Sequence, residues 1–220
     1  VYETYAVSTD SSLCAPVGRN ILALNGSAAD AAIAMLLCMG VTTPHLTGLS
    51  GGCLILYYNS SDKQMFGIDA REEAPKESRK DILTDNEERK AGLSVAIPGQ
   101  LSGYRELHDR FGRLEWTKLF DSAIQLSRDG FRVNNDLENA FIYVNKHLPK
   151  SSTLRKHYIN PKTNEHYKRG DIIKNIQLSQ TLTQLANSLD PIQLFYMGSV
   201  AKDIVQDIEE YAQQNNYTRE

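Results

Sequence analysis

The stretch AADAAIAMLLCMGV (28–41) constrains the fold more than any other, because it is apolar on nearly every side of a helix. Ser27, just before it, is a preferred N-cap residue, and Asp30 in the first turn suits the positive end of the helix dipole. A helix that is apolar all round must be covered by other elements. The stretch falls short of the roughly 18 uninterrupted apolar residues of a membrane span. We therefore expect a buried helix in a globular core.

Ahead of this helix, the sequence predicts a short strand and a first helix. YAVSTD (5–10) has strand character and leads to Ser11 or Ser12 as a helix cap. Apolar residues at helical spacing follow, until Asn25 and Gly26 end the pattern.

After the buried helix and a glycine-rich turn, the sequence predicts a β-hairpin. CLILYY (53–58) and QMFGID (64–69) are strand-like runs separated by NSSDK. Another short apolar strand is expected within 92–100, and the patterns beyond it are almost all helical. We therefore predict an α+β fold, with an α/β region at residues 1–98 and a mainly α-helical region at residues 99–220.

Composition excludes several classes of function. The chain is 41% hydrophobic and 23% charged with a net charge of −3, which gives no reason to expect nucleic acid as a partner. The five histidines show no metal-ligand spacing, and no phosphate-binding glycine motif occurs. We expect no metal and no cofactor.

GLSGG (48–52) satisfies the G-x-S-x-G pattern of serine hydrolases, with Ser50 as nucleophile and His45 nearby. That elbow needs a strand before the serine and a helix after it. Here a helix precedes the serine and a strand follows, so a glycine turn is the better interpretation.

Arg71, in IDAREEAP (68–75), follows the second hairpin strand. A guanidinium offers a planar fork of donors that matches a carboxylate and stays charged at every usable pH. The alternative is a structural ion pair with Asp69, Glu72 or Glu73. Spacing alone favours the ion pair.

Several segments in register resemble the large subunit of the γ-glutamyltransferase (glutathione hydrolase) family. They are AVSTD, NGSAADAA, PHLTGLSGG, DAREEAP, GLSVAIPGQ, FGRLEWTKLF and AIQLSRDGF. The resemblance runs in the family's order from about residue 5 to about residue 205 and is greatest to the animal, secretory-pathway members.

The resemblance implies part of the αββα core of an N-terminal nucleophile hydrolase, at residues 1–98. In this family a precursor cleaves itself, and a threonine at the new N-terminus of the small subunit attacks the γ-glutamyl amide of glutathione. Val1 cannot be that nucleophile, and no segment resembling the family's cleavage site occurs in the chain. We expect no catalytic residue here, so this chain alone would be inactive and would need the small subunit as its partner.

The resemblance also gives Arg71 a role. Residues 69–75 match the family motif D/N-x-R-E-x-A-P, whose arginine binds the glutamyl α-carboxylate. We therefore expect a large-subunit fragment that binds glutathione and related γ-glutamyl compounds through Arg71. The alternative is a truncated, catalytically inactive relative that acts as a binding or interaction protein.

The three cysteines can be assigned by the same resemblance. Animal relatives have a disulfide at positions matching Cys14 and Cys38, which leaves Cys53 as a buried free thiol.

Three N-x-S/T sequons occur, at Asn25, Asn59 and Asn216, and Asn59 matches a family glycosylation position. The implied location is extracellular, either secreted or on the outer face of the plasma membrane through an upstream anchor.

Overall fold

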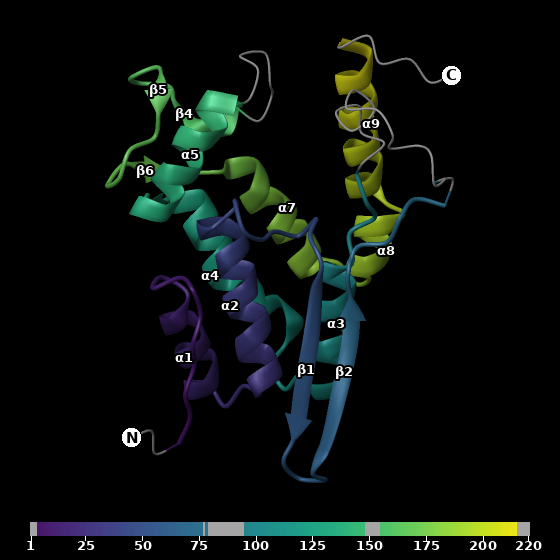
Figure 1. Cartoon of the computed structure of the whole chain (residues 1–220). Helices are drawn as coiled ribbons and strands as arrows, with labels where there is room; N and C mark the ends of the chain where they lie inside the picture. Colours follow the sequence, from purple (N-terminus) through teal and green to yellow (C-terminus); the bar gives the residue numbers. More distant parts are fainter. Residues whose placement is uncertain (1–3, 77, 79–94, 148–154, 215–220) are drawn as a thin grey trace. The chain divides into compact units, whose positions relative to one another are not determined.

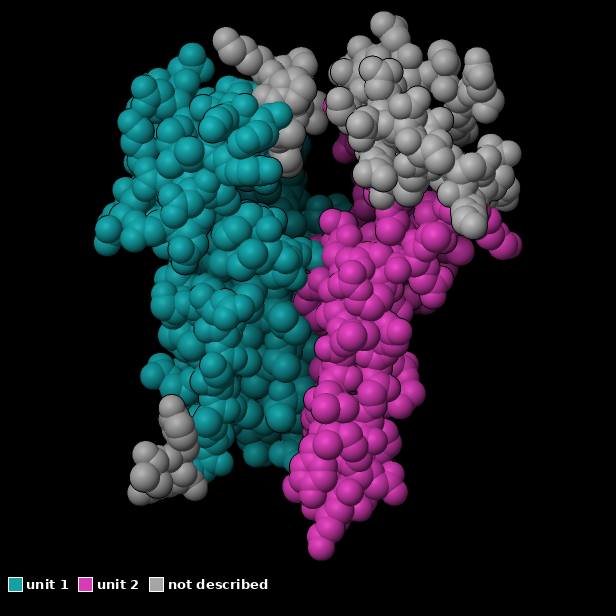
Figure 2. Space-filling view, in the orientation of Figure 1, with its two compact units in different colours: residues 1–48, 113–186 teal, residues 49–112, 187–220 magenta. Residues whose placement is uncertain are grey.

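The computed structural model describes residues 4–76, 78, 95–147 and 155–214 (Figure 1). Their contacts divide the chain into two compact units (Figure 2). The first unit comprises residues 1–48 and 113–186, and the second comprises residues 49–112 and 187–220. Each unit combines residues from both sides of position 98, where the sequence suggests a change of secondary structure.

The first unit is mainly helical. Its elements are α1 (Ala15–Ala23), α2 (Ala28–Thr42), α4 (Trp116–Asp129), β3 (Phe131–Arg132), α5 (Asn135–His147), α6 (Arg155–Tyr158), β4 (Ile159–Asn160), β5 (Glu165–His166), β6 (Ile172–Ile173) and α7 (Ile176–Asn187). The apolar helix α2 packs on α1 and on α4, as its sequence requires (Figure 1). The short strands form two antiparallel pairs, β3 with β6 and β4 with β5.

The start of α2 is fixed by a buried carboxylate. Ser27 and Asp30 form a capping box, in which the Ser27 N–H donates to Asp30 Oδ2 at 2.8 Å and the Asp30 N–H donates to Ser27 Oγ at 3.0 Å. The same Oδ2 accepts the N–H groups of Arg113 at 2.9 Å and Leu114 at 3.2 Å. Asp30 is 0% exposed. Its carboxylate therefore caps the helix and also holds a segment 83 to 84 positions later in the chain.

In its described residues, the second unit contains the hairpin and three helices. Its elements are β1 (Cys53–Asn59), β2 (Gln64–Ala70), α3 (Gln100–Phe111), α8 (Pro191–Tyr196) and α9 (Ser199–Gln214). The two strands pair antiparallel, with Cys53 opposite Ala70 and Asn59 opposite Gln64. The predicted hairpin is confirmed.

The two faces of the hairpin have different surroundings. On one face, Tyr57 stacks on Phe111 of α3 with ring centroids 4.0 Å apart, and Phe66 lies beside the same ring at 5.1 Å. On the other face, Leu56 is 73% exposed and Tyr58 is 55% exposed. The period-two alternation of a strand produces this division.

The strand expected at residues 5–10 is not present. A strand needs a hydrogen-bonding partner, and no described strand pairs with this segment.

The prediction of Ser11 or Ser12 as the N-cap of the first helix is also wrong. The N-cap of α1 is Cys14, and the Ser11 hydroxyl is buried against Thr42 Oγ1 at 3.2 Å.

The strand expected within residues 92–100 is reduced to one bridge. Residues 92–94 lie outside the described part, and Ile97 forms a single antiparallel bridge with Glu73. Gln100 already begins α3.

Candidate functional site

Arg71 lies directly after the last residue of β2, on a backbone held by local hydrogen bonds. Its N–H donates to Asp69 Oδ1 at 3.0 Å, which closes a turn at the end of the strand. Two residues later, Glu73 exchanges both backbone hydrogen bonds with Ile97, at 3.1 and 2.8 Å. Arg71 is therefore held between a strand and a backbone bridge.

The guanidinium of Arg71 pairs with its neighbour. Nη2 lies 3.0 Å from Glu72 Oε2, and the two side chains are 60% and 26% exposed. An ion pair this exposed contributes little to stability. Its effect is to restrict where the guanidinium points, while most of the side chain still faces solvent.

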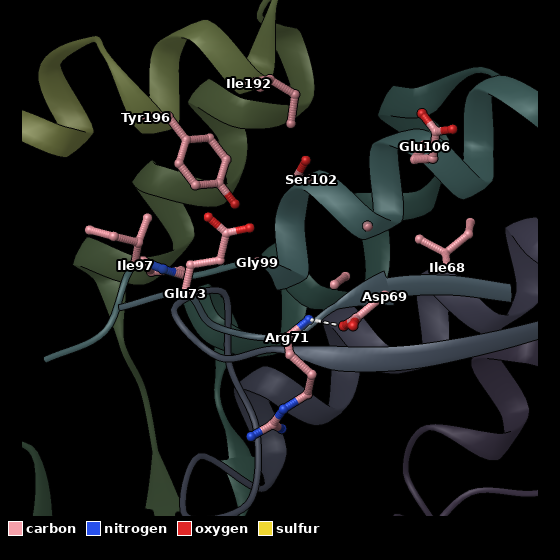
Figure 3. A pocket seen from close by; sticks show the side chains of 13 residues that line it. Ile68, Asp69, Arg71, Glu73, Ile97, Gly99, Ser102, Glu106, Ile192 and Tyr196 are labelled. Atoms are coloured by element: carbon pink, nitrogen blue, oxygen red, sulfur yellow. Dashed lines mark hydrogen bonds between the residues drawn. The ribbon is translucent and has the colours of Figure 1, made fainter. Parts of the chain in front are cut away.

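The sequence left three carboxylates as possible partners, and the structure distinguishes them. Glu72 forms the side-chain ion pair, whereas Asp69 accepts only from the backbone N–H of Arg71. The Glu73 side chain lies on the other side of the backbone from the guanidinium (Figure 3).

A pocket of about 470 Å³ opens beside this segment, entirely within the second unit (Figure 3). It is lined by Ile68, Asp69, Ala70, Arg71, Glu73, Ile97, Pro98, Gly99, Ser102, Gly103, Glu106, Ile192 and Tyr196. The Glu73 carboxylate and the Tyr196 hydroxyl point toward one another at one end, while the Arg71 guanidinium points away from that end. The lining residues therefore include the carboxylates of Asp69, Glu73 and Glu106 beside the single guanidinium of Arg71.

Burial perturbs two groups near this pocket. Burial raises the pKa of the Tyr196 hydroxyl, and the nearby backbone of Ser102 acts in the opposite direction. Burial also raises the pKa of the Cys53 thiol; the Glu72 carboxylate raises it further and Arg71 lowers it. Cys53 is free, as expected. It is half-buried, whereas the sequence analysis predicted a buried thiol.

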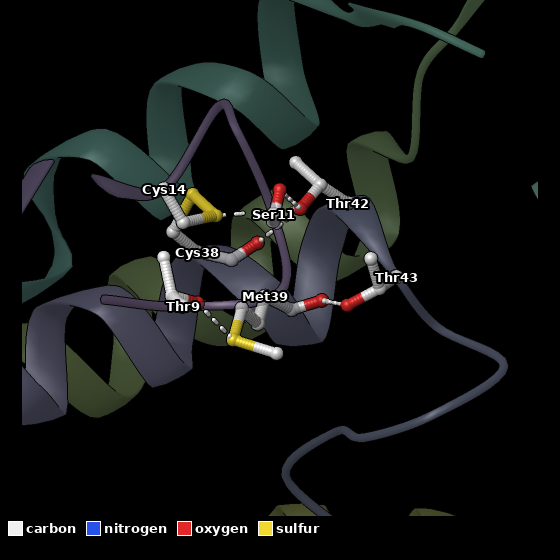
Figure 4. The surroundings of a disulfide bond; sticks show 7 residues. All are labelled: Thr9, Ser11, Cys14, Cys38, Met39, Thr42 and Thr43. Atoms are coloured by element: carbon white, nitrogen blue, oxygen red, sulfur yellow. Dashed lines mark hydrogen bonds between the residues drawn. A yellow bond between two sulfur atoms is a disulfide. The ribbon is translucent and has the colours of Figure 1, made fainter. Parts of the chain in front are cut away.

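The disulfide joins the expected pair of cysteines (Figure 4). Cys14 and Cys38 have a Cα–Cα distance of 5.6 Å and tie α1 to α2. Thr42 lies beside the bridge, with its hydroxyl 3.4 Å from the Cys14 sulfur and donating to the Cys38 carbonyl at 3.1 Å. The disulfide belongs to the first unit and takes no part in the pocket.

Where the structure describes them, the remaining sequence candidates do not form a second site. Ser50 lies in a turn between α2 and β1, so the strand–serine–helix order of a nucleophile elbow is absent there. Among the described residues, no group of three or more His, Cys, Asp or Glu could hold a metal ion. No helix in the described ranges is long and apolar enough to cross a membrane.

Two of the sequons lie in described segments. Asn59 ends β1 at the hairpin turn, where its Oδ1 accepts the Ser61 N–H at 3.1 Å. Asn25 is exposed after α1, with a φ of 65°. Asn216 lies outside the described residues.

Sequence reasoning missed Tyr196, which reaches the pocket from α8. This six-residue helix was not predicted, although a signal for it exists. Asp190 is a good N-cap residue, and Pro191 suits the first turn. The Asp190 side chain indeed accepts the Gln193 N–H at 2.8 Å.

Solved structures with a similar fold include γ-glutamyltranspeptidases. The enzyme from Helicobacter pylori superposes with a TM-score of 0.87 at 23% identity, over 96% of this chain and 61% of that chain. The enzyme from Pseudomonas nitroreducens, complexed with L-DON, gives a TM-score of 0.84 at 26% identity over 96% and 62%. The protein therefore has the α+β fold of this class of N-terminal nucleophile hydrolases.

The sequence comparisons agree with the fold. The family described as gamma-glutamyltranspeptidase matches residues 14–214. Scoloptoxin SSD14 of Scolopendra dehaani is 38% identical over 96% of this chain and 37% of its own length. The glutathione hydrolase 5 proenzyme of Rattus norvegicus is 37% identical over 92% of this chain and 36% of its own length. The chain belongs to the γ-glutamyltranspeptidase family, and it spans little more than a third of these relatives.

Proposed function

We propose that this chain is the part of a γ-glutamyltransferase or glutathione hydrolase that binds the α-carboxylate of γ-glutamyl compounds such as glutathione, through Arg71. The observation that carries the proposal is the setting of Arg71. Its backbone is held by Asp69 and by the Glu73–Ile97 bridge, while its side chain is 60% exposed at a pocket. Membership of the family and the resemblance of residues 69–75 to its carboxylate-binding motif support the same role.

The chemistry of the pocket suits an amino-acid head group. A guanidinium binds a carboxylate through two parallel N–H···O bonds. Glu72 restricts the guanidinium from one side, so less conformational freedom is lost when a carboxylate binds. The carboxylate of Asp69 lines the same pocket and offers an acceptor to an α-ammonium.

In the proposed enzyme, a threonine of the small subunit carries out the covalent step. Its hydroxyl attacks the γ-glutamyl carbonyl, an ester forms as the amide C–N bond breaks, and the departing amine takes a proton. Water or an acceptor amine then releases the glutamyl group. Arg71 holds the substrate in place during both steps and exchanges no proton.

The test is Arg71→Ala in the full-length product of the gene. The KM for a γ-glutamyl anilide should rise at least about tenfold while kcat changes little, because a binding contact shared by ground state and transition state is lost. Arg128→Ala is a matched control, because Arg128 is similarly exposed and also pairs with its neighbour, Asp129. A rise in KM below about threefold for Arg71→Ala would exclude this role.

We further propose that the protein passes through the secretory pathway. Disulfides form and persist in oxidising compartments, and the Cys14–Cys38 bridge and the Asn59 sequon at a hairpin turn fit such a compartment. Mass spectrometry of the protein from its source should show a linked Cys14–Cys38 peptide and a glycan on Asn59. A reduced pair together with a bare asparagine would contradict this location.

A further inference from the structure

Two glycines press against the backbone that carries Arg71. A Cβ built on Gly99 would lie 2.5 Å from the carbonyl oxygen of Arg71 and closer still to that of Ala70. A Cβ built on Gly52 would lie 2.8 Å from the Ala70 oxygen and 2.8 Å from the Glu72 nitrogen. Real side chains do not approach backbone atoms this closely, so neither position has room for one.

Space, and not backbone conformation, requires the glycine at position 99. Gly99 has a φ of −108°, which residues with side chains adopt readily. A larger residue there would keep the local backbone conformation and displace what it touches. The atoms it would displace are the carbonyls on either side of the Arg71 nitrogen.

The segments that carry these glycines are themselves fixed. The Gly51 carbonyl accepts the N–H of Gly99 at 3.1 Å and that of Gln100 at 3.0 Å. The Ile97–Glu73 bridge ties the same loop to the residue two positions after Arg71. The start of α3, the start of β1 and the end of β2 therefore meet around one short stretch of backbone.

We infer that Gly99 and Gly52 are positioning residues, which set the place of the Arg71 backbone and through it the place of the guanidinium that receives the substrate carboxylate. This inference rests on the proposed function. A methyl group at position 99 must push the Arg71 carbonyl away by on the order of half an ångström, which is about the tolerance of a binding constellation. Glu72 would move with its neighbour, so its ion pair could not restore the original position.

The inference predicts a loss of carboxylate recognition without a loss of chemistry. Gly99→Ala in the full-length protein should raise the KM for a γ-glutamyl anilide at least about fivefold, with kcat within about threefold of the parent. It should also reduce, by a similar factor, the preference for this substrate over its α-carboxamide analogue. A purely structural defect would lower activity toward both substrates equally.

Gly67→Ala is the matched control. Gly67 lies on β2, three residues before Ala70, and a Cβ built on it meets nothing within 4 Å. This variant should keep the KM and the preference of the parent. If Gly99→Ala folds and also keeps the preference within about twofold, the inference is wrong.

Arg71→Ala, assayed in parallel, separates the two proposals. If it abolishes the preference for the carboxylate while Gly99→Ala preserves it, the positioning role fails and the proposed function stands. If Arg71→Ala preserves the preference, the proposed function fails and the inference fails with it.

A second variant covers the case in which Gly99→Ala does not fold. In Gly52→Ala, the added methyl group would press on the Ala70 carbonyl from another segment. This variant should reduce the preference for the substrate carboxylate over the carboxamide in the same way. If neither variant folds, the two glycines are needed for the fold itself, and the specific role in carboxylate binding is overturned.

Discussion

The start of α2 in the first unit and the end of β2 in the second unit both place a charged side chain beside backbone groups, but they use the charge differently. Asp30 is 0% exposed and its Oδ2 accepts the N–H groups of Ser27, Arg113 and Leu114. Arg71 is 60% exposed and pairs with the residue next to it. The first charge is enclosed by hydrogen bonds from its own chain, and the second is held in place but still accessible.

The difference indicates which charges of a fold are available to a ligand. A buried carboxylate is tolerated only when hydrogen bonds from the protein replace those lost with water. Its hydrogen bonds therefore stabilise the fold and are not offered to a ligand. An exposed guanidinium on a fixed backbone contributes little to stability and can form stronger bonds when a carboxylate displaces water. Substitution of Asp30 should therefore change the stability of the protein, and substitution of Arg71 should change its binding of substrate.

The largest expected effect on stability is that of Asp30→Ala. The change leaves the buried N–H of Ser27 and the partly buried N–H groups of Arg113 and Leu114 without their acceptor, and we expect the free energy of unfolding to fall by about 4 kcal/mol. Urea denaturation measures it. Asp121→Ala is the control, because Asp121 is exposed on α4 and pairs with Lys118, so its loss should cost less than about 0.5 kcal/mol. Equal effects of the two changes would refute the architectural role of Asp30.

A smaller effect should separate the two faces of β1. Tyr57 stacks on Phe111, whereas its neighbour Tyr58 is 55% exposed. We expect Tyr57→Ala to lower the free energy of unfolding of the chain by about 2 to 3 kcal/mol and Tyr58→Ala by less than about 1 kcal/mol. Thermal or urea unfolding of the two variants side by side would decide, and a larger loss for Tyr58→Ala would reverse the assignment of the faces.

The smallest effect concerns the charges around Cys53, which is half-buried near Arg71 and Glu72. Because the thiolate is the reactive form and the pKa of this thiol is raised, alkylation should need a higher pH than for an exposed cysteine. Glu72→Gln should move the midpoint of the alkylation rate to lower pH, and Arg71→Ala should move it to higher pH.

The alkylation experiment is read by mass spectrometry of the peptide containing Cys53. Asp62→Asn serves as the control, because Asp62 lies in the hairpin turn at the other end of the strands. Unchanged midpoints in both test variants would show that the ion pair does not act on this part of the second unit.

Local sequence patterns were sufficient for much of the fold. The hairpin and the buried helix with its Ser27 cap are confirmed, and the helices α3, α4, α5, α7 and α9 agree with the mainly helical pattern expected after residue 98. Each depends on periodicity or capping within a few residues, and such signals are present in the sequence itself. The prediction of a strand at residues 5–10 was wrong for the opposite reason. A strand needs a pairing partner, and strand-like residues do not supply one.

The site was only partly predictable. The motif at residues 69–75 is the basis for proposing Arg71, and spacing could not say which carboxylate would pair with it. Tyr196 enters the pocket from a helix more than a hundred residues away in sequence, and no periodic pattern connects such positions. The crowding at Gly99 depends on three segments meeting, which a single sequence does not encode locally.

The link between Asp30 and residues 113 and 114 also affects how the chain is made. When α2 leaves the ribosome, the N–H groups that complete its buried carboxylate have not been synthesised, because they lie 83 and 84 positions further on. At typical translation rates the delay is roughly 4 to 17 seconds. For that time a strongly apolar helix carries an incompletely bonded charge. Chaperone binding to nascent chains should therefore peak in this interval and decline once residues 113–114 emerge.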